Sequence, residues 1–233
     1  MEKGACTYEP GGTMKSVLIA DDDRILRKMI SVALETAADQ LKIFEAEDGQ
    51  VAIDILEIEQ IDLVITDINM PRLNGLMVIA YLNVFFPAMP CFVMTAYGTS
   101  RLKSKLPHDL LKFYHKPLTV PELVADVLAV LASGPTGGER LTVSLANFLE
   151  LVILEGQTCT VTVEAEGVDP CHLFIEDGVL LDAVAGERRG EAVAVEAISR
   201  PDVSFSIEQG CPETIQKNID RLLEELIMQP DGS

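Results

Sequence analysis

Four apolar runs in the first 120 residues each end at, or lead directly into, a residue with a reactive or charged side chain. The runs VLIA, LVIT, CFVM and KFYH are followed by Asp21, Asp67, Thr95 and Lys116. Runs of this length are typical of strands buried on both faces of a parallel sheet, whose carboxyl ends meet at one edge, where ligands bind. We therefore expect these side chains to share one pocket.

This pocket would hold three carboxylates, because Asp22 adjoins Asp21, together with a hydroxyl and an ammonium. Such a set suits a divalent cation and a transferable phosphoryl group. Each motif alone has an ordinary structural explanation, since an acidic run often begins a helix and a Lys-Pro pair often marks a loop. Their occurrence together favours the shared site.

In combination and order, the motifs resemble the receiver domain of two-component response regulators, over residues 14–133. The run NMPRLNG, from Asn69 to Gly75, matches the loop after the family's acceptor residue, and EAEDGQVAIDIL matches its second strand and helix. The resemblance implies a flavodoxin-like α/β fold, a doubly wound five-stranded parallel sheet. The expected strands after the first lie at about 42–46, 61–66, 90–95 and 111–115, and helical segments alternate with them.

The resemblance also implies a role for each residue of the pocket. Asp67 would be the phosphoacceptor, and the Mg²⁺ ligands would be Asp21, Asp22, Asp67 and the backbone carbonyl of Asn69. The residues that bind the phosphoryl group and switch the domain would be Thr95, Ala96, Lys116 and Phe113, and Asn69 and Tyr97 are candidates for tuning the hydrolysis rate. Tyr97 would either cover the path of the attacking water or only line the pocket rim. A sensor histidine kinase or a phosphotransfer protein would be the donor, and the domain would be a switch rather than an enzyme.

The rest of the chain divides around this domain. Residues 1–13 are small, polar and rich in Gly and Pro, so we expect a disordered leading segment. The Gly- and Pro-rich residues 134–139 are expected to form a linker. Residues 140–233 then show an amphipathic helix, the alternating strand TCTVTVEA and an Asp177-Gly178 hairpin turn. This pattern predicts a second, smaller α+β domain.

The second domain resembles the PATAN domain, a family often attached to receivers. The resemblance rests on the leading helix, an F-x-x-D-G motif, Ala183 and Gly186 after it, and Gly190 at the start of a helix. It implies a role in binding a downstream protein partner and no catalytic residue. At the end of the chain, TIQKNIDRLLEELIMQ has the spacing of an amphipathic helix. That helix would either pack against its own domain or form a homodimer.

Charge limits the possible partners. The chain has 37 acidic and 18 basic residues, and residues 134–233 hold 19 acidic and 6 basic ones. Such a surface repels phosphate backbones, so we expect no nucleic-acid partner. A transcriptional regulator with a DNA-binding output stays open as an alternative, as does a phosphorylation-independent receiver scaffold.

Cysteine and histidine patterns exclude other classes of site. The five cysteines are odd in number and lack a CxxC pair, which favours free thiols in a reducing compartment. The three histidines are isolated, which disfavours a zinc site. No apolar run approaches the ~18 residues of a membrane span, and no signal peptide is visible. We therefore expect a cytoplasmic protein without a membrane partner.

Overall fold

The computed structural model describes residues 14–38, 40–96, 111–133, 144–165, 167–200, 203–222 and 225–226. The chain forms two compact units, Met1–Leu141 and Thr142–Ser233. The expected leading segment, residues 1–13, and the expected linker, residues 134–139, lie outside the described residues.

The first unit contains a five-stranded parallel sheet with the order β2-β1-β3-β4-β5. Its strands are β1 (Lys15–Ala20), β2 (Leu41–Ala46), β3 (Leu63–Asp67), β4 (Cys91–Thr95) and β5 (Leu111–His115). Every residue of β3 and β4 is buried, because helices cover both faces of the sheet. The fold class that the receiver resemblance implies, an α/β fold with a five-stranded parallel sheet, is confirmed.

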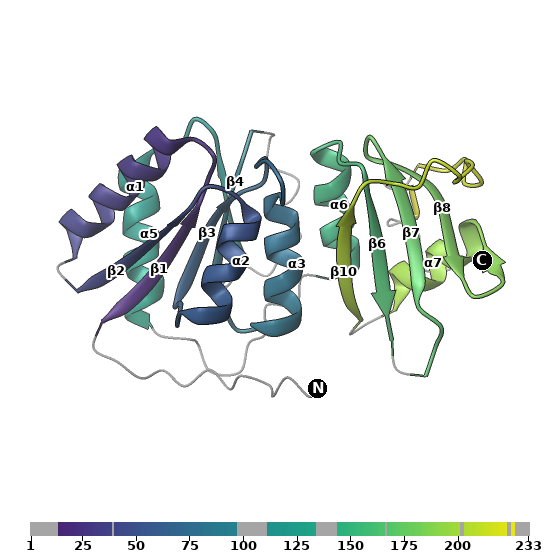
Figure 1. Ribbon diagram of the computed structural model, residues 1–233, viewed down its shortest axis with the longest axis horizontal. Helices are drawn as coiled ribbons and strands as arrows, with labels where there is room; N and C mark the ends of the chain where they lie inside the picture. The colour runs from purple at the N-terminus through teal and green to yellow at the C-terminus, as the bar shows by residue number, and fades with distance from the viewer. Residues whose placement is uncertain are drawn as a thin grey trace. The chain divides into compact units, whose positions relative to one another are not determined.

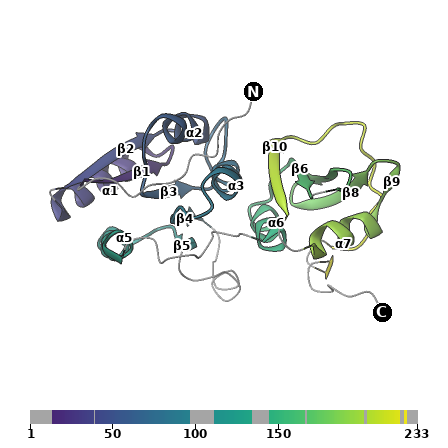
Figure 2. The ribbon, with the colours of Figure 1, turned by 90° about the horizontal axis from the view of Figure 1, so that it is seen from below.

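Four described helices cover this sheet: α1 (Arg24–Ala37), α2 (Gly49–Ile58), α3 (Gly75–Phe85) and α5 (Val120–Ser133). Helices α1 and α5 lie over one face, and α2 and α3 lie over the other (Figures 1 and 2). Between the sheet and the first pair lies an apolar core that includes Ile19, Ile30, Leu34, Phe92 and Leu123. Burial of such side chains stabilises each by about 1.5–3 kcal/mol relative to exposure.

Side-chain caps begin three of these helices. The carboxylate of Asp23 accepts hydrogen bonds from two amides of the first turn of α1, at 2.8 and 3.2 Å. Asp48 accepts from the Val51 amide at 2.8 Å, and Asn74 caps α3 through the Met77 amide at 3.2 Å. Each cap contributes about 1 kcal/mol. Because these helices start just after a strand ends, their capped ends lie near the carboxyl edge of the sheet.

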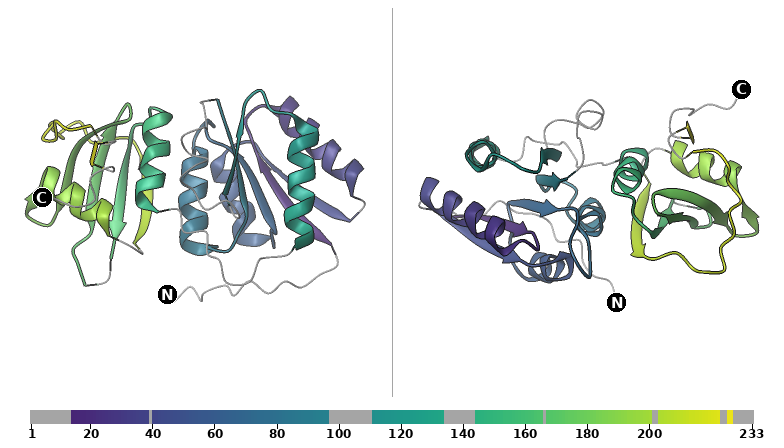
Figure 3. Two further views of the ribbon diagram at one scale, coloured as in Figure 1. Left: turned by 180° about the vertical axis from the view of Figure 1, so that it is seen from behind. Right: turned by 90° about the horizontal axis from the view of Figure 1, so that it is seen from above.

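The second unit is an antiparallel sheet with the order β10-β6-β7-β8-β9 and two helices. Its elements are α6 (Leu145–Leu154), β6 (Cys159–Glu164), β7 (Cys171–Glu176), β8 (Val179–Ala185), β9 (Arg188–Arg189), α7 (Glu191–Ser199) and β10 (Ser204–Gln209). Both helices lie over the same face of the sheet (Figure 3). The predicted hairpin between β7 and β8 is present, with φ values of 49° at Asp177 and 76° at Gly178.

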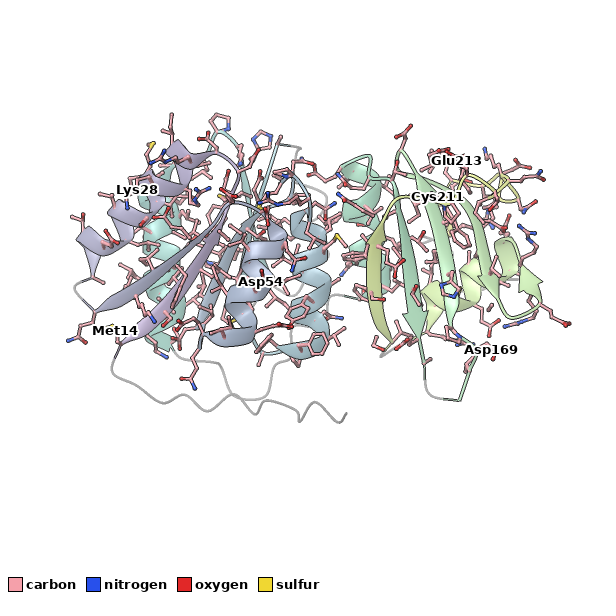
Figure 4. The ribbon with its side chains drawn as sticks, viewed as in Figure 1. Met14, Lys28, Asp54, Asp169, Cys211 and Glu213 are labelled. Atoms are coloured by element: carbon pink, nitrogen blue, oxygen red, sulfur yellow. The ribbon has the colours of Figure 1, made fainter. Side chains whose placement is uncertain are left out.

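The predicted C-terminal helix is wrong over the described residues 215–222, which have no helical backbone. Ile219 is buried, but Leu222, on the same predicted stripe, is 59% exposed. The backbone amides of Asn218 and Ile219 both donate to the Leu181 carbonyl of β8, at 2.8 and 3.1 Å. These tertiary hydrogen bonds replace the helical ones. The segment starts near Cys211 and Glu213 (Figure 4) and crosses the sheet face opposite α6 and α7 (Figure 3).

A buried carboxylate anchors this segment. Asp182 of β8 has no solvent exposure, and its oxygens accept hydrogen bonds from the Ala183 amide at 2.9 Å, Arg189 Nε at 3.0 Å and Asn218 Nδ2 at 2.9 Å. Burial opposes the charge of this carboxylate, yet the hydrogen bonds outweigh that effect and hold the pKa of Asp182 below its ordinary value. The ionised form is therefore the one that the fold stabilises.

Among the described residues, Cys91, Cys159, Cys171 and Cys211 are free thiols, and the first three are buried. None of the helices in the described ranges combines the length and the apolar character that crossing a membrane requires.

Asp182→Asn is expected to lower the free energy of unfolding of the second unit by about 2–3 kcal/mol at pH 7, because the hydrogen bonds to a charged acceptor are lost. An unfolded Asp titrates near about pH 3.9. The folded pKa is lower, so this stabilisation is present above about pH 4 and is lost as pH falls through the folded pKa. The difference between wild type and variant should therefore shrink in acid.

Urea unfolding of the full chain, followed by circular dichroism at pH 7 and at about pH 3.5, measures this difference. Asp220→Asn changes an exposed carboxylate and serves as the control. A difference that stays the same at both pH values would contradict the assigned role of Asp182.

Candidate functional site

The carboxyl ends of four adjacent strands bring the predicted residues together. Asp21 directly follows β1, Asp67 ends β3, Thr95 ends β4, and Lys116 follows β5. Parallel pairing sets Asp67 opposite Met94 and Thr95 opposite His115, so these strands end at one level. The expectation of one shared edge therefore agrees with the geometry.

Three carboxylates form an acidic cluster at this edge. One oxygen from each of Asp21, Asp22 and Asp67 lies within 4.8 Å of the others. Asp21 and Asp67 are buried, with 0% and 5% exposure, whereas Asp22 is exposed. Carboxylate oxygens at this spacing, with one side open to solvent, are the donors that Mg²⁺ prefers in proteins. The donor set therefore fits a magnesium ion.

Lys116 joins the two buried carboxylates. Its Nζ lies 2.9 Å from Asp21 Oδ2 and 3.0 Å from Asp67 Oδ2. The backbone is fixed as well, because the Lys116 amide donates to the Thr95 carbonyl at 2.8 Å. Burial opposes the charge on Lys116, but the hydrogen bonds to both carboxylates outweigh it and raise the pKa of the ammonium. One cation thus offsets part of the repulsion within the acidic cluster.

The site raises the pKa of the Asp67 carboxyl group. The pKa of Asp67 is raised to about 6: burial raises it most, the nearby charges of Asp21 and Asp22 also raise it, and Lys116 lowers it. Removing a carboxylate from water disfavours its charged form. A second positive charge placed in the cluster would therefore favour ionised Asp67.

Asp21 is held by contacts that the sequence analysis did not predict. Its Oδ1 accepts a hydrogen bond from the Asp23 amide at 2.8 Å, and the Arg27 guanidinium donates to its backbone carbonyl. Arg27 also pairs with Glu45 at 3.3 Å. The acidic run Asp21–Asp23 has two roles, because two of its members join the cluster and the third caps α1. No local pattern marks Arg27, whose position one turn into α1 looks solvent-facing.

The other predicted residues of the site differ in their exposure. Thr95 is 2% exposed and Phe113 is 6% exposed, whereas Ala96 and Asn69 are exposed. Successive side chains of a strand point to opposite faces of the sheet, so Phe113 and its neighbour Tyr114 lie on opposite faces of β5. The Tyr114 hydroxyl donates to Asp126 of α5 at 2.6 Å. Tyr97 lies outside the described residues. The roles of Thr95, Ala96, Phe113, Asn69 and Tyr97 stay predictions.

Gly75 allows α3 to start close to the acidic cluster. A Cβ at this position would lie 2.0 Å from the Asp67 carbonyl oxygen. The Gly75 amide also donates to the Ile68 carbonyl at 2.8 Å, which closes the loop formed by residues 68–74. Only glycine permits such a close backbone approach. The sequence motif NMPRLNG predicted this glycine but not its contact.

Lys116→Met is expected to raise the pKa of Asp67 from about 6 to about 7 or higher, because the nearest positive charge is removed and the charge on Asp21 remains. NMR titration of the side-chain carboxyl carbon, with EDTA present, measures this pKa. Lys112→Met removes an equal charge that pairs with Asp126 at 3.1 Å, and it should leave Asp67 unchanged. An unaltered Asp67 pKa in Lys116→Met would contradict the assigned pairing.

Comparisons with known proteins agree with this site. Residues 17–128 match the family model of the response regulator receiver domain. Response regulator protein FleR of Pseudomonas aeruginosa is 29% identical over 125 residues, which are 53% of this chain and 26% of FleR. Transcriptional regulatory protein PdtaR of Mycobacterium tuberculosis is 25% identical over 164 residues, 70% of this chain and 72% of PdtaR.

Among solved structures, chemotaxis response regulator CheY4 of Vibrio cholerae is 24% identical, with a TM-score of 0.45, and the match covers 51% of this chain and 99% of that one. The chain spans about a quarter of the length of FleR. The parallel sheet, the acidic cluster with Lys116 and the family match concern the same residues. Residues 17–128 of this protein are therefore a response regulator receiver domain.

Proposed function

We propose that the chain is a response regulator of a two-component phosphorelay that is phosphorylated on Asp67 and signals by protein–protein interaction. The observation that carries the proposal is the pair of contacts from Lys116 to Asp21 and Asp67 within the acidic cluster. A bare carboxylate cluster would bind a cation, but the adjoining ammonium also suits the oxygens of a transferred phosphoryl group. The donor is a phosphohistidine of a sensor kinase or a phosphotransfer protein.

In this proposal each residue has a defined task. An Asp67 oxygen forms a bond to phosphorus while the bond from phosphorus to the donor's imidazole nitrogen breaks, and the imidazole leaves. Lys116 and the Thr95 hydroxyl stabilise the negative charge on the transferred oxygens. Movement of Lys116 from the carboxylates toward these oxygens would weaken its bond to Asp21. Phosphorylation thereby changes contacts at the ends of β1, β3 and β5 together.

Magnesium would be held by Asp21, Asp22, Asp67 and the backbone carbonyl of Asn69. It supplies positive charge that offsets repulsion among the carboxylates and the incoming phosphoryl oxygens. Such a charge would also lower the pKa of Asp67, which burial raises to about 6, so the nucleophile is ionised when phosphorylation begins.

The second unit would be a PATAN-like domain that binds the downstream protein. Its small α+β architecture and its hairpin with Asp177 and Gly178 support this proposal. Gly190, with a φ of 91°, stands at the start of α7, as the PATAN resemblance expects. A surface with 19 acidic and 6 basic residues after residue 133 favours a basic protein partner over a nucleic acid.

Incubation with Mg²⁺ and acetyl phosphate is expected to add one phosphoryl group to wild-type protein and none to Asp67→Ala, because the substitution removes the nucleophile. Intact-mass spectrometry measures the gain. Asp54→Ala removes an exposed carboxylate of α2 (Figure 4) and should be phosphorylated like wild type. Equal labelling of Asp67→Ala and wild type would place the acceptor elsewhere. No labelling of wild type, with a receiver of known activity labelled in parallel, would favour the phosphorylation-independent scaffold.

A DNA-binding output is the second candidate, because the match to transcriptional regulatory protein PdtaR is longer than the receiver domain. The acidic second unit opposes it. Fluorescence anisotropy with labelled duplex DNA, before and after phosphorylation, tests this candidate. We expect no binding even at low salt, where a basic surface would bind most tightly. Binding that weakens steeply with added salt would support the transcriptional regulator instead.

A further inference from the structure

The loop after the acceptor, residues 68–74, contains an unusual backbone conformation. Arg72 has a φ of 62°, and Asp177 is the other non-glycine residue with positive φ in the described part of the chain. A side chain with a Cβ disfavours this conformation, which persists where surrounding contacts hold it. The Arg72 side chain makes contacts of this kind.

The Arg72 side chain reaches the start of α2. Its guanidinium donates to Glu47 Oε1 at 3.0 Å and contacts the carboxylate of Asp48. Asp48 has no solvent exposure, and its other oxygen accepts from the Val51 amide. Buried carboxylates are costly unless they are paired and hydrogen-bonded. The guanidinium thus places a positive charge against the oxygen of Asp48 that the helix cap leaves over, and that oxygen has no hydrogen bond of its own in the described structure.

A second contact joins the same two segments. The Gly49 amide donates to the Leu73 carbonyl at 2.8 Å. A Cβ at Gly49 would lie 2.5 Å from that carbonyl oxygen, so the two backbones approach as closely as glycine allows. With the bond from Gly75 to Ile68, the loop is fixed at its two ends and attached to α2 in between.

We propose that Arg72 is a positioning residue of the phosphorylation site, which acts through its ion pair with Asp48. The pair holds residues 68–74 in one conformation, and this loop contains Asn69, whose backbone carbonyl belongs to the proposed magnesium ligands. The inference rests on the proposed function. Arg72 itself touches none of the three clustered carboxylates, so its effect is exerted through the backbone.

Arg72→Gln is expected to raise the Mg²⁺ dissociation constant about 10-fold, as is typical when a residue that orients metal ligands is lost. The substitution unpairs Asp48 and lets the loop leave its positive φ. Arg72→Lys keeps the charge and should restore part of the affinity. Asp48→Asn keeps an oxygen for the α2 cap but loses the ion pair, so it should match Arg72→Gln. The double variant should be no weaker than either single one, because both act on one contact.

Isothermal titration calorimetry with MgCl₂ on the full chain measures these constants, and thermal unfolding checks the fold of each variant. Lys42→Gln is the matched control: it removes an equal charge from an exposed pair with Glu59, at 3.0 Å. The acetyl phosphate reaction gives a second readout. Arg72→Gln should be slow at limiting Mg²⁺ and should approach the wild-type rate at saturating Mg²⁺, a pattern that a merely destabilised fold would not produce.

Equal Mg²⁺ affinities of wild type, Arg72→Gln and Lys42→Gln would overturn the inference, even if Arg72→Gln unfolded at a lower temperature. Equal losses in Arg72→Gln and Lys42→Gln would overturn it too, because net charge alone would then explain the effect. In both cases wild type still binds Mg²⁺ and accepts phosphate. Wild-type protein that does neither would overturn the proposed function, and this inference with it.

Discussion

The contact of one ammonium with two buried carboxylates is the interaction on which the site depends. Asp21 and Asp67 lie at the carboxyl ends of the neighbouring strands β1 and β3 and have almost no contact with solvent, so their negative charges would repel each other strongly if they were alone. Lys116, between them, offsets this repulsion. The offset is partial, since burial still raises the pKa of Asp67 to about 6. The site is thus stable enough to fold and retains a preference for further positive charge.

The surrounding structure serves to hold these three groups at fixed positions. Parallel pairing sets the ends of β1, β3 and β5 at one edge. The Asp23 amide holds the Asp21 carboxylate, Arg27 holds the Asp21 backbone carbonyl, and the Thr95 carbonyl holds the Lys116 amide. The close approach of Gly75 places the start of α3 against Asp67. Each of these contacts has a backbone group as donor or acceptor, so the frame does not depend on side-chain pairing alone. A switch requires this combination of a rigid frame and exchangeable side-chain contacts.

The sequence predicted the receiver fold and the clustered residues well, because buried parallel strands appear as continuous apolar runs and their carboxyl ends must converge. The same local reasoning failed for residues 215–222. Their apolar spacing suits a helix, but hydrogen bonds to Leu181 and the buried Asp182, distant in sequence, decide the backbone. The contact between Arg72 and Asp48 was equally unpredictable, since it joins two loops and depends on a positive φ that arginine rarely adopts. Sequence patterns thus report burial better than pairing between polar groups.

The central claim is that Lys116 exchanges its bond to Asp21 for one to a phosphoryl group on Asp67. A crystal structure with Mg²⁺ and beryllium fluoride, a phosphoryl mimic, tests it most directly. The account predicts the mimic on Asp67, the metal among Asp21, Asp22 and Asp67, and Lys116 Nζ within hydrogen-bond distance of a fluoride. A mimic bound elsewhere, or Lys116 still joined to both carboxylates beside an occupied Asp67, would contradict it.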